Sequence, residues 1–392
     1  MKELGVNSYR FSVSWTRIIP EGTGEINQKG IDFYNALIDE LIKNDITPML
    51  TLFHWDYPHE LEKQGGWKNE NSPAWFLEYA KVVYKAFSDR VKYFITFNEP
   101  QCFIGSGYLD GAHAPGKKCS NQDVVIMAHN VMLAHGLAVK ALREIAPNCK
   151  VGYAPTGSVG LPATNKPEDI EVARQRYFDI DLNCWTWNIS WWSDPIMLGR
   201  YPEDLPAFKE LGQYLPKNYK EDLKIISEPI DFYCQNIYNG AHYKKGENGA
   251  EWVPNSTNTA ITTAGWPVTP EALYWGPKFL FERYKKPIIL SENGMAGYDA
   301  ISLDGKIHDF DRIDFMHRYL LALEKAIDEG VEIEGYMYWS LMDNFEWAKG
   351  YSMRFGLVHV DYETLKRTPK DSFYWYRDVI KSAGKKLHEF DK

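Results

Sequence analysis

Short apolar runs alternate along the chain with longer segments of helical periodicity. Each run is bounded by Gly, Pro or Asn, as is typical of buried parallel strands. The sequence predicts seven such strands, at 6–15, 46–55, 93–97, 151–155, 231–238, 287–290 and 335–341.

The segments between these strands have amphipathic helical patterns. In 31–43, the spacing places five apolar side chains on one face: Tyr34, Leu37, Ile38, Leu41 and Ile42. Similar stripes predict helices at 122–145, 271–284 and 310–329. A further helix is expected after Ser72, read as an N-cap residue with Pro73 at the first helical position.

Strand–helix alternation predicts an α/β fold with a parallel sheet and right-handed crossovers. A (β/α)8 TIM barrel fits the length of 392 residues, although that barrel has eight strands and the patterns predict seven. The irregular stretch 201–251 is one place where a strand could be hidden. No linker or low-complexity segment divides the chain, so a single domain over 1–392 is expected.

Composition narrows the classes of partner. The chain has 44 basic and 53 acidic residues, a net charge of −9, and no basic run. Neither nucleic acid nor an anionic membrane surface is therefore expected as a partner. Aromatic residues make up 15% of the chain, with 14 Trp and 25 Tyr. These rings suit a large core, and they also suit a site where sugar C–H faces stack on them.

The five scattered cysteines contain no CxxC pair, so reduced thiols are expected rather than a disulfide framework or a zinc site. No cofactor is expected, because the chain lacks a dinucleotide fingerprint and a phosphate loop. His129 and His135 are six apart and do not share a metal-binding helix face. We expect no apolar run of transmembrane length and no signal peptide at the start, and therefore a cytoplasmic protein.

Two glutamates stand out by their position. Glu99 follows the strand at 93–97, and Glu292 follows the strand at 287–290. In parallel barrels, functional groups lie at the carboxyl ends of the strands. A pair of carboxylates at two such ends indicates acid–base chemistry, although each alone could simply stabilise a helix end.

The local sequences around these glutamates resemble the two active-site motifs of the β-glucosidase family, family 1 of the glycoside hydrolases. They are Thr96-Phe97-Asn98-Glu99-Pro100 and Ser291-Glu292-Asn293-Gly294. The similarity extends over essentially the whole chain. Further matching segments are Tyr9-Arg10-Phe11-Ser12, His54-Trp55-Asp56, His113-Ala114-Pro115-Gly116, Gly199-Arg200-Tyr201-Pro202 and 339–347.

The resemblance implies a retaining mechanism with Glu292 as nucleophile and Glu99 as general acid/base. Such a mechanism requires their carboxyl groups to lie about 5–5.5 Å apart. Arg10 and Tyr238 are implied as neighbours that keep Glu292 ionised. The family's sugar-binding residues map onto His54, Trp55, Asn98, Asn236, Tyr238, Trp339, Glu346 and Trp347.

Two details of the resemblance bear on the substrate. Plant thioglucosidases of the family carry Gln at the position of Glu99, so O-glycosides are expected here. The segment 344–347 differs from the phospho-glycosidase branch, and a carboxylate at Glu346 would repel a 6-phosphate. An unphosphorylated β-D-glucoside or oligosaccharide is therefore expected, with β-galactosides or β-fucosides as second substrates. Trp266 is a candidate for the aglycone side, or a loop-packing residue.

Family members begin with one more strand and helix than this sequence contains, so the resemblance implies an incomplete barrel without its first βα unit. Exposed strand edges would then invite self-association into a homo-oligomer. Two alternatives to a working β-glucosidase stay open. One is a catalytically impaired sugar-binding paralogue, suggested by the missing strand. The other is an endo-acting cellulase of the same clan.

Overall fold

The computed structural model describes residues 1–389. Contacts group the chain into two compact units. Unit 1 consists of Met1–Asn7, Ser158–Tyr177 and Asn236–Lys392, and unit 2 consists of Ser8–Gly157 and Phe178–Gln235. A single domain over 1–392 stays a prediction, and its residues 390–392 lie outside the described part.

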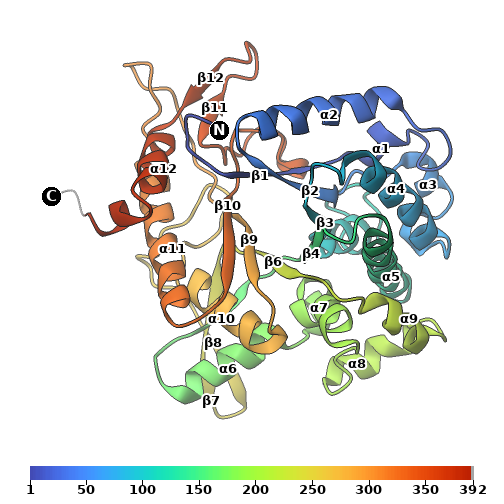
Figure 1. Cartoon of the computed structure of the whole chain (residues 1–392). Coiled ribbons are helices and arrows are strands. Elements are labelled where there is room, and N and C mark those ends of the chain that lie inside the picture. The colour runs from blue at the N-terminus through green and yellow to red at the C-terminus, as the bar shows by residue number, and fades with distance from the viewer. Residues whose placement is uncertain (390–392) are drawn as a thin grey trace. The chain divides into compact units, whose positions relative to one another are not determined.

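Unit 2 is built on parallel strands that pair in chain order (Figure 1). These strands are β1 (Ser8–Ser12), β2 (Thr47–Phe53), β3 (Tyr93–Asn98), β4 (Lys150–Ala154) and β6 (Phe232–Asn236), whose last residue belongs to unit 1. Every residue of β2 after Thr47 is buried, as expected for a parallel strand covered on both faces.

Helices follow these strands and supply the crossovers. They are α1 (Trp15–Ile18), α2 (Gln28–Lys43), α3 (His59–Lys63), α4 (Ser72–Phe87), α5 (Asn121–Ile145), α7 (Ile189–Leu198), α8 (Pro206–Leu211) and α9 (Tyr219–Ile226). Short 3-10 turns occupy Gly66–Lys68, Leu182–Trp187 and Gly212–Tyr214, and Gln101–Leu109 is a π-helix.

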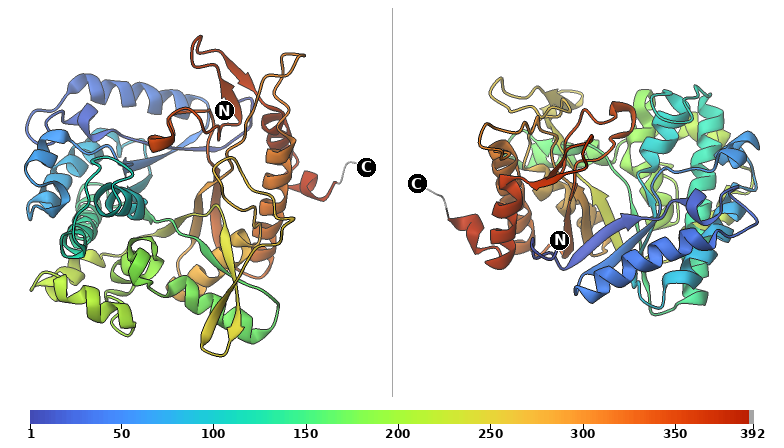
Figure 2. Two further views of the ribbon diagram at one scale, coloured as in Figure 1. Left: turned by 180° about the vertical axis from the view of Figure 1, so that it is seen from behind. Right: turned by 90° about the horizontal axis from the view of Figure 1, so that it is seen from above.

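Unit 1 contains the parallel pair β9 (Ile288–Asn293) and β10 (Ile333–Tyr338). A second sheet, whose β7–β8 hairpin is visible in Figure 2, consists of β5 (Val159–Pro162), β7 (Gly240–Gly246) and β8 (Gly249–Val253). An antiparallel pair is formed by β11 (Val358–Val360) and β12 (Arg367–Pro369). The helices are α6 (Pro167–Phe178), α10 (Ala272–Tyr284), α11 (Phe310–Asp328) and α12 (Asp371–Lys381), with 3-10 turns at Trp347–Lys349 and Lys385–His388.

All seven predicted strands are confirmed, as β1, β2, β3, β4, β6, β9 and β10. The stretch 201–251 does contain missed strands, but β7 and β8 belong to the second sheet. Strand β9 runs further than predicted, so Glu292 lies within it rather than beyond its end.

The predicted helices are confirmed with local corrections. Ile42 is 41% exposed although it was placed on the buried stripe of α2, whose inward face is centred on Tyr34, Ile38 and Leu41. Ser72 is not the cap of α4: Asn71 precedes the helix, and the Ser72 hydroxyl donates to the carbonyl of Trp67 at 3.2 Å.

Helix α5 corrects the expectation that no segment is apolar and long enough to cross a membrane. By length and hydropathy this helix passes that test, the one helix to do so among residues 1–389. However, 78% of its apolar window is buried inside the protein, as is common for a core helix.

Much of the aromatic content packs the core of unit 2. The Phe97 ring stacks on Phe76 with centroids 4.4 Å apart, and Phe53 meets Phe103 edge-on at 4.8 Å. Phe97 directly precedes Asn98 and Glu99, so this cluster fixes the end of β3. Core packing therefore accounts for much of the aromatic content, and fewer rings remain as ligand-binding candidates.

Candidate active site

Glu99 lies at the carboxyl end of β3. Its backbone N–H donates to the carbonyl of Ala154 at the end of β4, at 2.7 Å. The Cys102 thiol donates a hydrogen bond to Oε2 of its side chain at 3.1 Å. Glu99 is only 7% exposed, so its carboxyl group is surrounded mainly by protein atoms rather than by water.

Asn98 organises the predicted residues of unit 2. Arg10 on β1 donates through Nη2 to the amide oxygen of Asn98 at 2.5 Å, and through Nε to Thr51 Oγ1 at 3.2 Å. The Trp55 indole N–H donates to the carbonyl of Asn98 at 2.9 Å. The structure therefore brings Arg10, Trp55 and Asn98 together, and their role in sugar binding stays a prediction.

The amide nitrogen of Asn98 lies 3.3 Å from Nε2 of His54. Burial, followed by the positive charge of Arg10, lowers the pKa of His54 to about 3. The imidazole is therefore neutral at physiological pH. Because the Asn98 amide donates, Nε2 is the acceptor and Nδ1 carries the proton of the neutral ring.

In unit 1, Tyr238 and Glu346, two of the predicted site residues, interact with Glu292. The Tyr238 hydroxyl donates to its Oε2 at 2.7 Å, as predicted, and the residue is 4% exposed. Its backbone carbonyl accepts from Ile237 at 2.9 Å. One residue earlier, Ser291 Oγ donates to Oδ1 of Asn236 at 2.6 Å. These contacts fix the ends of β6 and β9 and aim the carboxylate.

Glu346 lies in the loop after β10. The pKa of Glu346 is raised to about 7, mainly by burial and next by the negative charge of Glu292. A hydrogen bond from Trp339 opposes this shift by lowering the pKa. Trp339 is itself anchored, because its backbone N–H donates to Asn293 at 2.9 Å. The structure thus places Glu346 and Trp339 in the electrostatic neighbourhood of Glu292.

Backbone strain coincides with three predicted site residues. Trp55, Glu99 and Trp347 have positive φ angles of 82°, 45° and 43°. Only eight non-glycine residues among 1–389 adopt such angles, which are costly for L-residues. Strain of this kind concentrates at functional sites, so its position supports the candidate site independently of the sequence motifs.

Further residues support this site, among them two to which the sequence assigned no role there, Asn293 and Tyr336. Asn293 donates to the carbonyl of Ile237 at 2.8 Å and accepts from the Tyr336 hydroxyl at 2.9 Å. The Trp266 ring lies 5.0 Å from that of Tyr238, which favours a site location over simple loop packing. The one sequence signal for Asn293 is its place next to Glu292 in the motif. Nothing in the sequence indicates its contact with Tyr336.

Glu99 belongs to unit 2 and Glu292 to unit 1. The distance between their carboxyl groups therefore stays a prediction, as does the role of Arg10 beside Glu292.

No group of three or more His, Cys, Asp or Glu side chains within residues 1–389 is placed to hold a metal ion. His129 instead lies between the Tyr201 hydroxyl at 2.9 Å and Asp222 at 3.0 Å. His135 contacts Thr96 Oγ1 at 2.7 Å. Both are core histidines with protein partners. The structure shows no disulfide bond among the five cysteines, which all lie within residues 1–389.

Comparison with known proteins identifies the family. The profile described as Glycosyl hydrolase family 1 matches residues 1–385. β-Glucosidase A of Thermotoga maritima is 44% identical over 390 residues, covering 98% of this chain and 84% of the relative. A β-glucosidase of Agrobacterium sp. is 38% identical and covers 99% and 83%, respectively.

Solved structures agree. The family 1 β-glucosidase of Thermotoga maritima in complex with isofagomine lactam superposes with a TM-score of 0.88 at 43% identity, over 98% of this chain and 84% of that one. The same enzyme in complex with galacto-hydroximolactam also gives 0.88. The chain belongs to glycosyl hydrolase family 1. It is a glycoside hydrolase with an α/β fold of the TIM-barrel type.

Proposed function

We propose that this protein is a retaining β-glucosidase that removes terminal, unphosphorylated β-D-glucosyl groups. The observation that carries the proposal is the buried Glu292, near the end of β9, which accepts a 2.7 Å hydrogen bond from the Tyr238 hydroxyl. Relatives at about 40% identity that are named β-glucosidases support the substrate class. The two-carboxylate mechanism follows from the family membership.

Glu292 attacks the anomeric carbon, and the bond to the aglycone oxygen breaks. Glu99 donates its proton to that oxygen, so the aglycone leaves as a neutral alcohol and a covalent glucosyl-enzyme forms. In the second step, Glu99 takes a proton from water, and the resulting hydroxide attacks the same carbon. Glucose leaves with its original β configuration, and Glu292 regains its negative charge. The Tyr238 hydroxyl stabilises that carboxylate as it departs.

Sugar recognition is assigned to polar groups that are already oriented. On unit 2 they are the neutral His54 and Asn98. On unit 1 they are Asn236 and Glu346, with Trp339 and Trp347 as stacking or N–H partners. A site of this type rejects analogues that lack a hydroxyl, because a buried polar group loses its partner.

The preference for an unphosphorylated sugar rests on Glu346. Its carboxyl group can accept hydrogen bonds from free 4- and 6-hydroxyls, whereas a 6-phosphate would add two negative charges beside Glu292 and Glu346. β-Galactosides and β-fucosides are the proposed second substrates. Faster turnover of the 6-phosphorylated glucoside than of the glucoside would refute this part of the proposal.

The direct test is hydrolysis of a chromogenic aryl β-D-glucoside by the purified chain, with Glu292→Ala as the background. Proton NMR of the first product identifies its anomer. Release of β-glucose that disappears in Glu292→Ala supports the proposal, and initial release of α-glucose refutes the retaining mechanism. Sugar binding without turnover would favour the impaired paralogue, which the comparisons do not favour.

Two further expectations belong to the proposal. The first is a homo-oligomer, and sedimentation velocity tests it, because a strictly monomeric chain at high concentration contradicts it. The second is a cytoplasmic location, and fractionation of the source cells tests it.

A further inference from the structure

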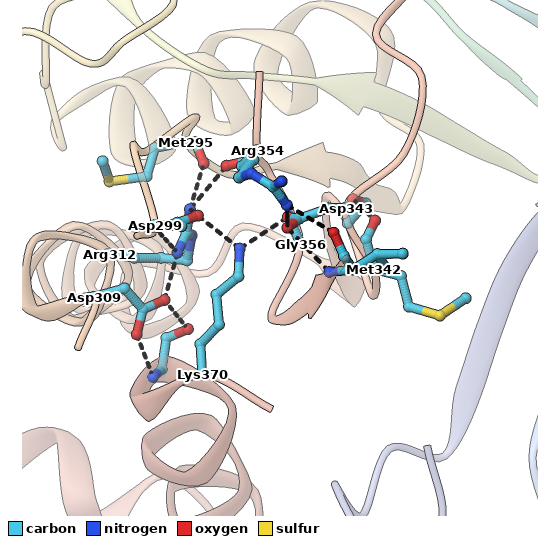
Figure 3. Close-up of polar contacts among 12 residues, drawn as sticks. Met295, Asp299, Asp309, Arg312, Met342, Asp343, Arg354, Gly356 and Lys370 are labelled. Carbon is cyan, nitrogen blue, oxygen red and sulfur yellow. Dashed lines mark hydrogen bonds and ion pairs between the residues drawn. The ribbon is translucent and has the colours of Figure 1, made fainter. Parts of the chain in front are cut away.

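Six charged side chains of unit 1 form a network that joins the loops after β9 and β10 to the starts of α11 and α12 (Figure 3). The network consists of three carboxylates and three cations, Asp299, Asp309, Asp343, Arg312, Arg354 and Lys370. All except Arg354 have side chains that are at most 4% exposed. Charges buried to this degree are stable only with their partners, so the network acts as one unit.

Lys370 joins the two loops. Its Nζ lies 2.6 Å from Asp299 and 2.8 Å from Asp343. Asp299 belongs to the loop after β9, seven residues beyond Glu292, and Asp343 lies three residues before Glu346. A single ammonium group therefore links the segment behind the proposed nucleophile to the segment that carries the proposed glucose-binding carboxylate.

The Asp343 carboxylate accepts hydrogen bonds from its own loop as well as from Lys370. Within the loop, the donors are Arg354 Nη1 at 2.6 Å and the backbone N–H of Gly356 at 2.9 Å. Its side chain is fully buried. These contacts fold the segment 343–356 into a closed loop, and the Glu346 N–H donates to the Gly350 carbonyl at 2.7 Å within it.

Arg312, in the first turn of α11, completes the connection. It donates through Nη2 to Asp299 at 2.6 Å and to the carbonyl of Arg354 at 2.9 Å. The backbone N–H of Gly297 donates to the same carbonyl at 3.0 Å. The two loops are therefore joined by side chains and by main chain at one point, and a shift of one loop moves the other.

We propose that Lys370, together with Asp299 and Asp343, is a positioning group that sets where Glu346 and Trp347 lie relative to Glu292. None of the three is assigned a contact with the sugar. They act through the loop that presents Glu346, and so they determine how strongly the enzyme prefers sugars that carry a 6-hydroxymethyl group. This inference rests on the proposed β-glucosidase function.

The test is the ratio of kcat/KM for an aryl β-D-glucoside to that for the matching β-D-xyloside, which lacks the 6-hydroxymethyl group. Lys370→Met removes the link, and Asp343→Asn weakens it with almost no change in shape. Each variant is expected to lower the ratio at least about tenfold, the lower end of the value of one lost hydrogen bond to a charged group. A role in stability alone would lower both rates by the same factor and leave the ratio unchanged.

Lys278→Met is the matched control. Lys278 pairs with Glu329 and Tyr274, and so links α10 to the residue after α11 rather than the loops that follow β9 and β10. It should keep the wild-type ratio. The proposal is overturned if Asp343→Asn, or a folded Lys370→Met, retains the wild-type ratio, or if Lys278→Met lowers it equally. If Lys370→Met does not fold, Asp343→Asn decides alone. A wild-type chain inactive on both substrates would instead refute the proposed function.

Discussion

The pKa of Glu346 leads to a prediction about stability. Burial and the charge of Glu292 raise this pKa from 4.5 to about 7 in the folded protein. The folded state therefore binds a proton between these pH values that the unfolded chain has released. Stability from this group is fully present below pH 4.5 and is lost as the pH rises to about 7.

The magnitude follows from the two pKa values. Each pKa unit corresponds to about 1.4 kcal/mol, so Glu346 should remove on the order of 3 kcal/mol of stability between pH 4.5 and 7. Glu346→Gln cannot titrate and should lack this loss. The difference in unfolding free energy between wild type and variant, from urea titrations at pH 4.5 to 8, should change by that amount and then level off.

Two variants sharpen the experiment. In a Glu292→Gln background the neighbouring charge is gone, so the step due to Glu346 should move to lower pH. Glu60→Gln is the control, because a hydrogen bond to Lys63 lowers the pKa of the exposed Glu60 and any effect has the opposite sign. A wild-type minus Glu346→Gln difference that does not vary with pH would refute the reasoning.

Three further predictions follow from single contacts. Tyr238→Phe removes the 2.7 Å hydrogen bond to Glu292 and should lower kcat/KM on an aryl glucoside roughly 10- to 100-fold, the value of a hydrogen bond to a charged group; an unchanged rate would contradict this role. Phe97→Ala opens the stacked core beneath Glu99 and should cost about 3–5 kcal/mol in urea unfolding, whereas Phe310→Ala at a 66% exposed position should cost far less. Burial lowers the pKa of His54 from 6.5 to about 3, so only the unfolded chain takes up a proton there as the pH falls below 6.5. The free energy of unfolding should therefore fall by about 1.4 kcal/mol for each pH unit below 6.5, down to about pH 3. In His54→Asn this acid side of the stability curve should be shallower, and an equal slope would count against a neutral, buried imidazole.

The sequence by itself determined the parallel strands and the positions of both glutamates. Buried strands read as continuous apolar runs, so the seven runs were visible without any knowledge of their neighbours. Glu99 and Glu292 could be selected because each stands at the carboxyl end of an apolar run, where parallel barrels place functional groups, and because the segments around them resemble the family's two motifs. Local signals were less reliable at helix surfaces and ends, where Ile42 proved exposed and Ser72 proved not to be a cap.

Only the tertiary structure decided how these residues act on one another. Lys370 is 71 residues from Asp299 and 27 from Asp343, and no periodicity connects positions so far apart. The raised pKa of Glu346 and the lowered pKa of His54 depend on burial and on charges from other elements. Hydrogen-bond partners, pKa values and strained backbone angles are properties of neighbours in space, and the chain acquires those neighbours only when it folds.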